Sequence, residues 1–498
     1  MTPDDESKPV TEAEMRPHMI RGSIWMVAMR WTIKGIGIIS TVILARLLVP
    51  EDFGIVAMAM LVVGIIELFN LVGTDLALIR HKNATREHFD SAWTIGVIQS
   101  LILGTCVLLA APLGETFFDE PRAVPVIQIL SLRVYAQGFE NIGTVLFLKE
   151  LDFAKEYRFR IARKVTTFIV TLVLALSIQN YWALVAGIVT GQVFFVVLSY
   201  IVHPYRPRLC FTKIPELWSF SMWALVYWAG HYASLRMDEI IVGRISNSQA
   251  MGHYYVGSDV ATTPTAEMIA PLGRALFPSY SRLQDNPKQL YDAYLNVLSA
   301  VTLICFATGT GLALVAHDLV VVFLGEKWIE SIPIMFWIAF AAAVFVYSNT
   351  AMTVLLAAGF ARRAAIQIWT RNGLLLAALI YAGMRGGLTD IAAMRLWMTL
   401  LFVPVFFYSL RVVIPIKVRD VLDVTWRPAI AAAAMAGVLH LIPDGVFGDL
   451  IALRLFVDVV VGGAVYGLTV LGLWYAAGQP PGSERAAMRA VRGRLKAA

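Results

Sequence analysis

The chain has 498 residues, of which 58% are hydrophobic and only 15% are charged, and its formal net charge is +6. So little polar surface cannot cover a soluble globule of this size, which excludes a soluble protein and indicates a polytopic membrane protein. The apolar runs have the length of membrane-spanning helices and lack the short alternating strands of an outer-membrane barrel.

The N-terminal residues 1–23 are polar and partly acidic at their start. They predict a disordered cytoplasmic tail and no cleavable signal peptide, because a long apolar run follows them. The cysteines, Cys106, Cys210 and Cys305, are widely separated. Their spacing indicates neither a disulfide framework nor a metal site, so we expect no cofactor.

Apolar windows of helix length recur along the whole chain and predict fourteen transmembrane helices in an all-α fold. No predicted connection is long enough for a soluble domain, so the function is expected in or across the membrane. The predicted spans are 24–45, 53–73, 91–111, 124–148, 161–178, 181–202, 217–237, 251–277, 293–315, 331–356, 364–383, 390–410, 428–442 and 450–476.

The distribution of Lys and Arg orients these spans. With the N-terminus inside, most cations fall on the cytoplasmic side, including all of those between Lys149 and Lys164. This asymmetry predicts that both termini are cytoplasmic. The positive net charge then reflects contact with anionic lipid, and no nucleic-acid partner is expected. The predicted outer connections hold only Arg46, Arg122, Arg244, Lys327 and Arg385.

A degenerate internal repeat divides the chain. Residues 44–58 align with residues 242–256, about 200 residues later, and the alignment superimposes Arg46 on Arg244. Each copy holds six spans, so the two copies enter the membrane in the same direction, as in transporters built from parallel repeats. The expected segments are the cytoplasmic tail 1–23, a first lobe 24–210, a second lobe 211–415, two extra helices 416–478 and a basic cytoplasmic tail 479–498.

Several cations fall inside the predicted spans. Arg30 and Lys34 share one helix face, and Lys34 lies about 15 Å from the start of its helix, near the middle of the bilayer. Arg236 and Arg371 add charge in the second lobe. Snorkelling to the lipid head groups is an ordinary explanation for Arg30, but a central lysine favours a hydrated cavity or an acidic partner. Together they predict an electropositive cavity for a phosphate or diphosphate head group.

Acidic residues also fall inside the spans, and two interpretations stay open for them. They either form structural ion pairs with neighbouring cations or take up protons or sodium to couple transport to a gradient. Glu67 and Glu267 are matched by the repeat and, with Asp259, are the candidates for coupling; Asp75 and Glu140 complete the set.

Tyr227 and Trp228 belong to a cluster of aromatic residues that could stack on sugar rings, although packing is the more common role of such residues. The sequence contains no phosphate-binding GxxxxGK[ST] loop and no HExxH or GxSxG motif, so ATP hydrolysis and hydrolase chemistry are not expected. We therefore expect a protein that is not an enzyme and has no catalytic residues.

Three stretches carry a family resemblance: "LARLLVPEDFGIVAMA" at 44–59, "LFNLVGTDLALIR" at 68–80 and "LDFAKEYRFRIAR" at 151–163. The chain resembles the polysaccharide transporter branch of the multidrug/oligosaccharidyl-lipid/polysaccharide exporter superfamily. Within that branch it is similar to the Wzx-type flippases of O-antigen and exopolysaccharide synthesis.

The resemblance implies two six-helix lobes arranged as a V, with two extra C-terminal helices. It also implies a flippase that moves an undecaprenyl-diphosphate-linked oligosaccharide to the periplasmic leaflet by alternating access driven by an ion gradient. Head-group binding would fall on Arg30, Lys34, Arg236 and Arg371. The implied partners are membrane lipids, a polysaccharide polymerase and a chain-length regulator, and the protein itself is expected to be a monomer.

Three alternatives stay open. A lipid II flippase would use the same charge pattern, and a multidrug or cation antiporter would need an acidic cavity. A non-transporting membrane scaffold of a polysaccharide synthase complex would show no transport after reconstitution. The sequence does not identify the sugar.

Overall fold

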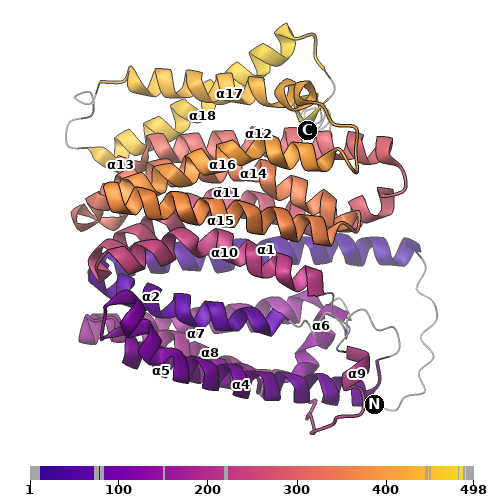
Figure 1. The fold of residues 1–498 in the computed structure, drawn as a ribbon, viewed down its shortest axis with the longest axis vertical. Coiled ribbons are helices and arrows are strands. Elements are labelled where there is room, and N and C mark those ends of the chain that lie inside the picture. Colours follow the sequence, from indigo (N-terminus) through magenta and orange to yellow (C-terminus); the bar gives the residue numbers. More distant parts are fainter. Residues whose placement is uncertain are drawn as a thin grey trace. The chain divides into compact units, whose positions relative to one another are not determined.

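The computed structural model describes residues 12–71, 78, 84–149, 152–217, 222–443, 447, 450–480, 482–485 and 488. All the secondary-structure elements in these residues are helices (Figure 1). The chain divides into two compact units, Met1–Phe220 and Ser221–Ala498. Asp75, one of the predicted intramembrane acids, lies outside the described residues.

In the first unit α4 packs against α5, α7 packs against α8, and α1 lies along α7. Buried Val, Ile, Leu and Ala side chains of α2, α4, α5 and α8 form its apolar core. The helices of this unit are α1 (Glu12–Leu47), α2 (Pro50–Glu67), η1 (Leu68–Leu71), α4 (Arg86–Phe118), α5 (Ala123–Gln137), η2 (Ile142–Thr144), α6 (Val145–Lys149), α7 (Phe153–Ile178), α8 (Trp182–Val202) and α9 (Ile214–Leu217).

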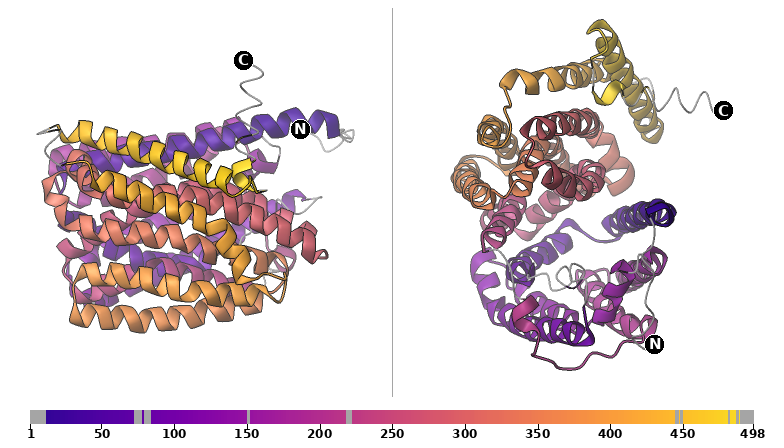
Figure 2. Two further views of the ribbon diagram at one scale, coloured as in Figure 1. Left: turned by 90° about the horizontal axis from the view of Figure 1, so that it is seen from above. Right: turned by 90° about the vertical axis from the view of Figure 1, so that its right-hand side faces the viewer.

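In the second unit α14 packs against α11, α12 and α16, while α10 packs against α15. Figure 2 (right) shows most helices of each unit end-on, so within a unit the helix axes are nearly aligned. The helices of this unit are α10 (Met222–Ile245), α11 (Ser248–Leu283), α12 (Pro287–Leu314), α13 (Ala316–Leu319), η3 (Val320–Leu324), η4 (Glu326–Ser331), α14 (Ile332–Ala357), α15 (Ala361–Arg385), α16 (Leu388–Leu410), α17 (Val418–His440) and α18 (Ile451–Ala476).

Within the described residues, nine helical segments are long and apolar enough to cross a membrane, so the chain is a multi-pass membrane protein. Each of the fourteen predicted spans coincides with a long helix or, in one case, a broken one. The all-α polytopic fold is therefore confirmed.

The prediction of a single span at 124–148 is wrong, because the chain leaves the helix after Gln137 and resumes as short helical segments from Ile142. The side chain of Asn141 stabilises this interruption of the helix. Its amide donates to the backbone carbonyl oxygen of Tyr205 over 2.8 Å, and its Oδ1 accepts from the backbone N–H of Gly143 over 3.0 Å. A buried amide that serves backbone groups outside the helix competes with the helical pattern.

The helix α7 begins at Phe153, eight residues before the predicted start of its span at 161. Asp152 caps it by accepting from the backbone N–H of Lys155 over 3.2 Å, which satisfies one of the unpaired donors of the first turn. Arg160, Arg163 and Lys164 therefore lie on the same continuous helix as the apolar span, whereas the sequence grouped them with a cytoplasmic connection.

The connection between α1 and α2 is closed by Asp52. Its carboxylate accepts from the backbone N–H of Val49 over 3.1 Å and from that of Tyr181 over 2.9 Å, so it ties the first turn of α2 to the start of α8. Beside it, Arg122 forms ion pairs with Glu51 and Glu120. Hydrogen bonds to Glu120 and Glu51 raise the pKa of the Arg122 guanidinium above its usual value.

Replacing Asp52 with alanine is expected to lower the free energy of unfolding by about 1–3 kcal/mol, because two backbone N–H groups lose their acceptor. Thermal unfolding of the purified protein in detergent measures the change. Glu51→Ala is the control: its ion pair with Arg122 is half exposed, so it is expected to change stability by less than about 1 kcal/mol. Equal effects of the two substitutions would contradict the role of Asp52.

Candidate functional site

A cationic pocket lies inside the first unit. It has a volume of about 320 Å³ and is lined by residues of α1, α5, α7 and α8, which are Ile33, Arg133, Arg160, Arg163, Lys164, Thr167, Ile188 and Phe195. Three of its four cations are on α7 at positions 160, 163 and 164, where helical spacing places them on one side of the helix. Four cations around one pocket among membrane-spanning helices suit a strongly anionic ligand.

Acidic and amide side chains hold these cations in place. Arg133 lies 3.1 Å from the carboxylate of Glu67, and Arg160 lies 2.7 Å from that of Glu156. The side chains of Arg133 and Glu67 are each 19% exposed, so this pair is partly shielded from solvent. The sequence interpretation that Glu67 forms an ion pair therefore agrees with the geometry.

Arg163 is oriented by a chain of hydrogen bonds that runs through the uncharged side chain of Gln192. It donates to Oε1 of Gln192 over 2.7 Å, and Nε2 of Gln192 donates to Oε1 of Glu140 over 2.8 Å. Its guanidinium carbon also lies 4.5 Å from the centre of the Phe195 ring, a cation–π contact. Arg163 is thereby held at the pocket wall by Gln192 and Phe195, with the carboxylate of Glu140 at the far end of the chain.

Two of the predicted head-group residues, Arg30 and Lys34, lie half-buried on α1, the helix that packs against α7. Their neighbour Ile33 lines the cationic pocket, but Arg30 and Lys34 are not among the lining residues. The same helix passes Lys164 at Gly37, where a Cβ atom would be in ordinary van der Waals contact with the Lys164 side chain. The sequence thus pointed to the correct helix, while the pocket itself is built mainly by α7.

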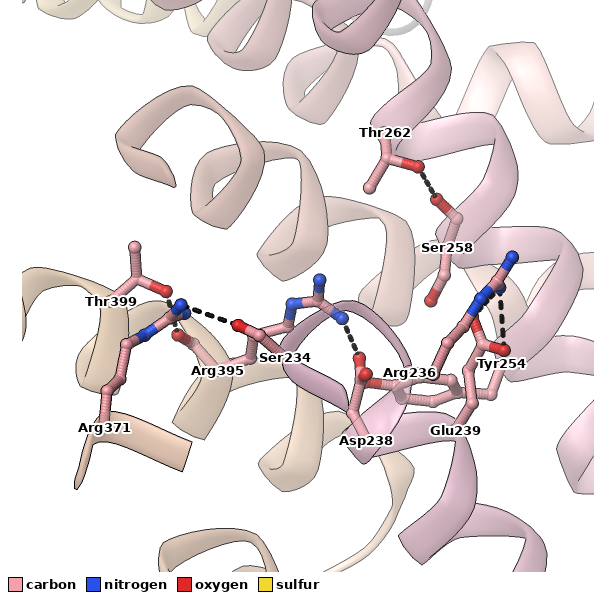
Figure 3. A network of polar contacts seen from close by, with 10 residues as sticks. All are labelled: Ser234, Arg236, Asp238, Glu239, Tyr254, Ser258, Thr262, Arg371, Arg395 and Thr399. Carbon is pink, nitrogen blue, oxygen red and sulfur yellow. Dashed lines mark hydrogen bonds and ion pairs between the residues drawn. The ribbon is translucent and has the colours of Figure 1, made fainter. Parts of the chain in front are cut away.

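The second unit contains a buried network of charged side chains (Figure 3). Asp238 on α10 pairs with Arg395 on α16, and its Oδ2 also accepts from the hydroxyl of Tyr254 over 2.7 Å. The Asp238 side chain is 2% exposed and that of Arg395 is 14% exposed. A carboxylate with so little solvent contact needs both partners to offset the loss of hydration.

The other two predicted head-group residues, Arg236 and Arg371, belong to the same region (Figure 3). Arg236 pairs with Glu239 over 2.7 Å on α10, and Arg371 on α15 donates to Oγ of Ser234 over 2.7 Å. Arg371 is buried, and its Nε has no hydrogen-bond partner among the described residues. The structure therefore brings Arg236 and Arg371 onto neighbouring helices of one unit.

The most deeply buried acids of this region, Asp238 and Glu239, were missed by the sequence reasoning. The predicted span ended at residue 237, whereas α10 continues to Ile245. The run "RMDEII" at 236–241, read as a continuing helix, is the signal that could have found them.

The predicted coupling acids of the second unit are not in this network. Asp259 is exposed on α11, and Glu267, two turns further along the same helix, is half-buried. Of the three coupling candidates, Glu67 alone lies at an ion pair beside the cationic pocket.

The helices that are long enough to span a membrane, together with the pockets between them, define a multi-pass α-helical membrane protein. The family follows from the sequence comparison. Residues 43–333 match the family described as polysaccharide biosynthesis protein, and the chain belongs to this family.

Relatives with assigned names occur in several bacteria. The succinoglycan biosynthesis transport protein ExoT of Rhizobium meliloti is 22% identical over 481 residues, which are 95% of this chain and 94% of the relative. The lipopolysaccharide biosynthesis protein WzxC of Escherichia coli is 24% identical over 330 residues, covering 64% of this chain and 66% of the relative.

Solved structures share the fold at low sequence identity. The inward closed conformation of the lipid II flippase MurJ superimposes with a TM-score of 0.71 at 13% identity and covers 92% of this chain and 99% of that chain. This similarity concerns the fold alone.

Proposed function

We propose that the protein is a flippase for lipid-linked oligosaccharides. It moves a polyprenyl-diphosphate-linked sugar unit from the cytoplasmic to the periplasmic leaflet of the bacterial inner membrane by alternating access. The cationic pocket of the first unit carries this proposal, because it supplies several positive groups where a diphosphate would have to leave water. Family membership and the named transport relatives support the same function.

The charge balance of the pocket favours an anion over a cationic drug. Arg133 and Arg160 have carboxylate partners, whereas Arg163 is held by Gln192 and Phe195. Guanidinium groups bind phosphate oxygens through two parallel hydrogen bonds, which a cationic drug cannot accept. A multidrug or cation antiporter would need an acidic pocket, so the observed lining disfavours that alternative.

Arg30, Lys34, Arg236 and Arg371 are proposed as further contacts of the charged head group as it moves. Arg30 and Lys34 lie on α1, and Ile33 of the same helix lines the cationic pocket. The polyprenyl tail stays in lipid, because its transfer into water would expose a large apolar surface. The proposed mechanism needs no catalytic residue.

Coupling to an ion gradient is proposed with Glu67, Glu267 and Asp259 as candidate groups. Glu67 has the clearest physical link to substrate, because its partner Arg133 lines the pocket. A phosphate that binds Arg133 would compete with Glu67 for this cation.

Reconstitution tests the function directly. Purified protein is placed in liposomes containing a fluorescent polyprenyl-diphosphate-linked oligosaccharide, and a membrane-impermeant quencher reports the fraction in the outer leaflet. Protein-dependent equilibration of this lipid, but not of fluorescent phosphatidylglycerol, is the expected result. Absence of movement, together with unchanged surface polysaccharide in cells lacking the gene, would contradict the proposal and favour a non-transporting scaffold.

A further inference from the structure

We propose that a separate cavity in the second unit, with a mainly apolar lining that also presents polar side chains, binds one sugar ring of the substrate, a role that rests on the proposed flippase function. The cavity has a volume of about 230 Å³ and lies among α10, α11, α14 and α16. Its polar lining comes from His231, Thr262, Thr265, Asn349, Arg395 and Thr399.

The threonine hydroxyls of this cavity present acceptors. Thr262 donates to the backbone carbonyl oxygen of Ser258 over 2.8 Å, and Thr399 donates to that of Arg395 over 2.7 Å (Figure 3). Because each hydroxyl hydrogen is used within its own helix, the oxygen lone pairs are left to accept hydrogen bonds from a ligand. The hydroxyl oxygens of Thr265 and Thr308 are 3.4 Å apart, so the Thr265 hydroxyl can also make a hydrogen bond to a ligand.

Asn349 supplies donors and an acceptor in the middle of the apolar helix α14. Its side-chain amide lines the cavity and makes no hydrogen bond to any described residue. Asn349 is half-buried, so its amide donors and its acceptor are open to the cavity and can bind a ligand there.

Arg395 contributes hydrogen-bond donors but little net charge. Its guanidinium lines the cavity and pairs with Asp238, which neutralises it. The other donors of the guanidinium make no hydrogen bond to described residues. The lining therefore holds one cation, and that cation is paired, whereas four cations line the pocket of the first unit. The guanidinium carbon of Arg371 lies 5.4 Å from the centre of the Phe345 ring, but Arg371 is not among the lining residues.

An aromatic wall completes the cavity. Phe345 lies on α14, with its ring centre 6.4 Å from that of His231 on α10. A sugar ring has polar edges and an apolar C–H face, so a cavity with hydroxyl, amide and imidazole groups beside an aromatic ring matches it.

Other ligand classes fit this lining less well. No carboxylate is among the described residues that line the cavity, which disfavours a metal ion. Among the lining residues, a diphosphate would find only Arg395, which Asp238 neutralises, and a lipid chain would offer no partner to the Asn349 amide. The volume is below the roughly 300–1,000 Å³ of sites for drug-sized ligands, so it suits a single ring.

The test compares two lipids that differ only in the sugar. The first is the lipid-linked oligosaccharide that accumulates in cells lacking the gene, and the second is the corresponding bare polyprenyl diphosphate. Binding of each is measured by isothermal titration calorimetry with the full-length protein in nanodiscs. The wild type is expected to bind the glycosylated lipid roughly tenfold more tightly, because several hydrogen bonds are added.

The double variant Thr265→Val, Asn349→Leu removes hydrogen-bonding groups at nearly constant volume. It is expected to reduce the preference for the glycosylated lipid roughly three- to tenfold while leaving the affinity for bare diphosphate unchanged. Thr353→Val, on α14 and outside the cavity lining, is the matched control and should keep the wild-type preference. If the double variant binds neither lipid, Thr262→Val alone provides the same comparison.

A wild type without preference for the glycosylated lipid, or a variant with unchanged preference, would overturn the sugar site. Failure of the flippase function is recognised separately. In that case cells lacking the gene accumulate no lipid-linked oligosaccharide, and the wild type moves neither lipid in liposomes.

Discussion

Replacing Arg163 with alanine is expected to weaken the binding of polyprenyl diphosphate by about tenfold to a hundredfold and to slow its translocation correspondingly. Hydrogen bonds to charged groups contribute about 1.5–3 kcal/mol each, and Arg163 is the pocket cation that Gln192 and Phe195 hold without a carboxylate in those contacts. The affinity is measured by calorimetry in nanodiscs, and translocation is measured in the quencher assay.

The control lies on the same helix. Arg158 is exposed and does not line the pocket, so Arg158→Ala removes the same charge and is expected to leave affinity and translocation close to wild type. Arg163→Lys keeps the charge but loses the planar fork, and an intermediate affinity is expected.

The salt dependence adds a second readout. Binding that depends on ion pairs should weaken as ionic strength rises, and the Arg163→Ala variant should show a smaller dependence than the wild type. If Arg158→Ala and Arg163→Ala reduce binding equally, general surface charge explains the binding and the pocket does not. Unfolding midpoints are compared in parallel, because the alanine variant leaves the Gln192 amide oxygen without its donor.

Replacing Asp238 with alanine is expected to destabilise the second unit by about 3–5 kcal/mol, because it leaves Arg395 buried without its counter-charge. Tyr254 loses its hydrogen-bond acceptor as well. Unfolding in denaturant, followed by the fluorescence of tryptophan residues, measures the change in free energy. The accompanying loss of transport is expected to follow the loss of folded protein.

A double-mutant cycle measures the interaction energy between Asp238 and Arg395. Asp238→Leu combined with Arg395→Met removes both charges together, and the double variant is expected to be more stable than Asp238→Ala, because no buried charge is left unpaired. Arg419→Ala breaks the exposed pair with Asp423, whose side chains are 90% and 65% exposed, and should cost less than about 1 kcal/mol. Additive effects of the Asp238 and Arg395 substitutions would show that the two groups do not interact energetically.

Hydropathy and charge bias carried most of the information on the fold. Long apolar windows predict helices because a membrane leaves the backbone no other partner than itself, and this constraint does not depend on the neighbours of a helix. The prediction of a continuous helix failed at 138–144, where the side chain of Asn141 binds backbone groups of a segment more than 60 residues away. No sequence pattern around residue 141 indicates a contact with a segment so far along the chain.

The candidate site was only partly predictable. Arg30, Lys34, Arg236 and Arg371 stand out because a charge in an apolar window is conspicuous, and the structure finds Arg371 buried on α15. Arg160, Arg163 and Lys164 were overlooked because a cluster of cations near a span end is typical of a cytoplasmic loop. Their role depends on α7 beginning early enough to carry them along the membrane-spanning helix.

The sequence by itself determined that the protein is an all-helical, multi-pass membrane protein with intramembrane charges and without a nucleotide-binding loop. Those properties depend on composition and on local periodicity, which require no knowledge of the neighbouring helices. Only the tertiary structure decided which charges pair, such as Asp238 with Arg395, and which face a cavity, such as Arg163. The physical reason is that pairing and burial depend on distances between helices that are far apart in the chain, and no local pattern records those distances.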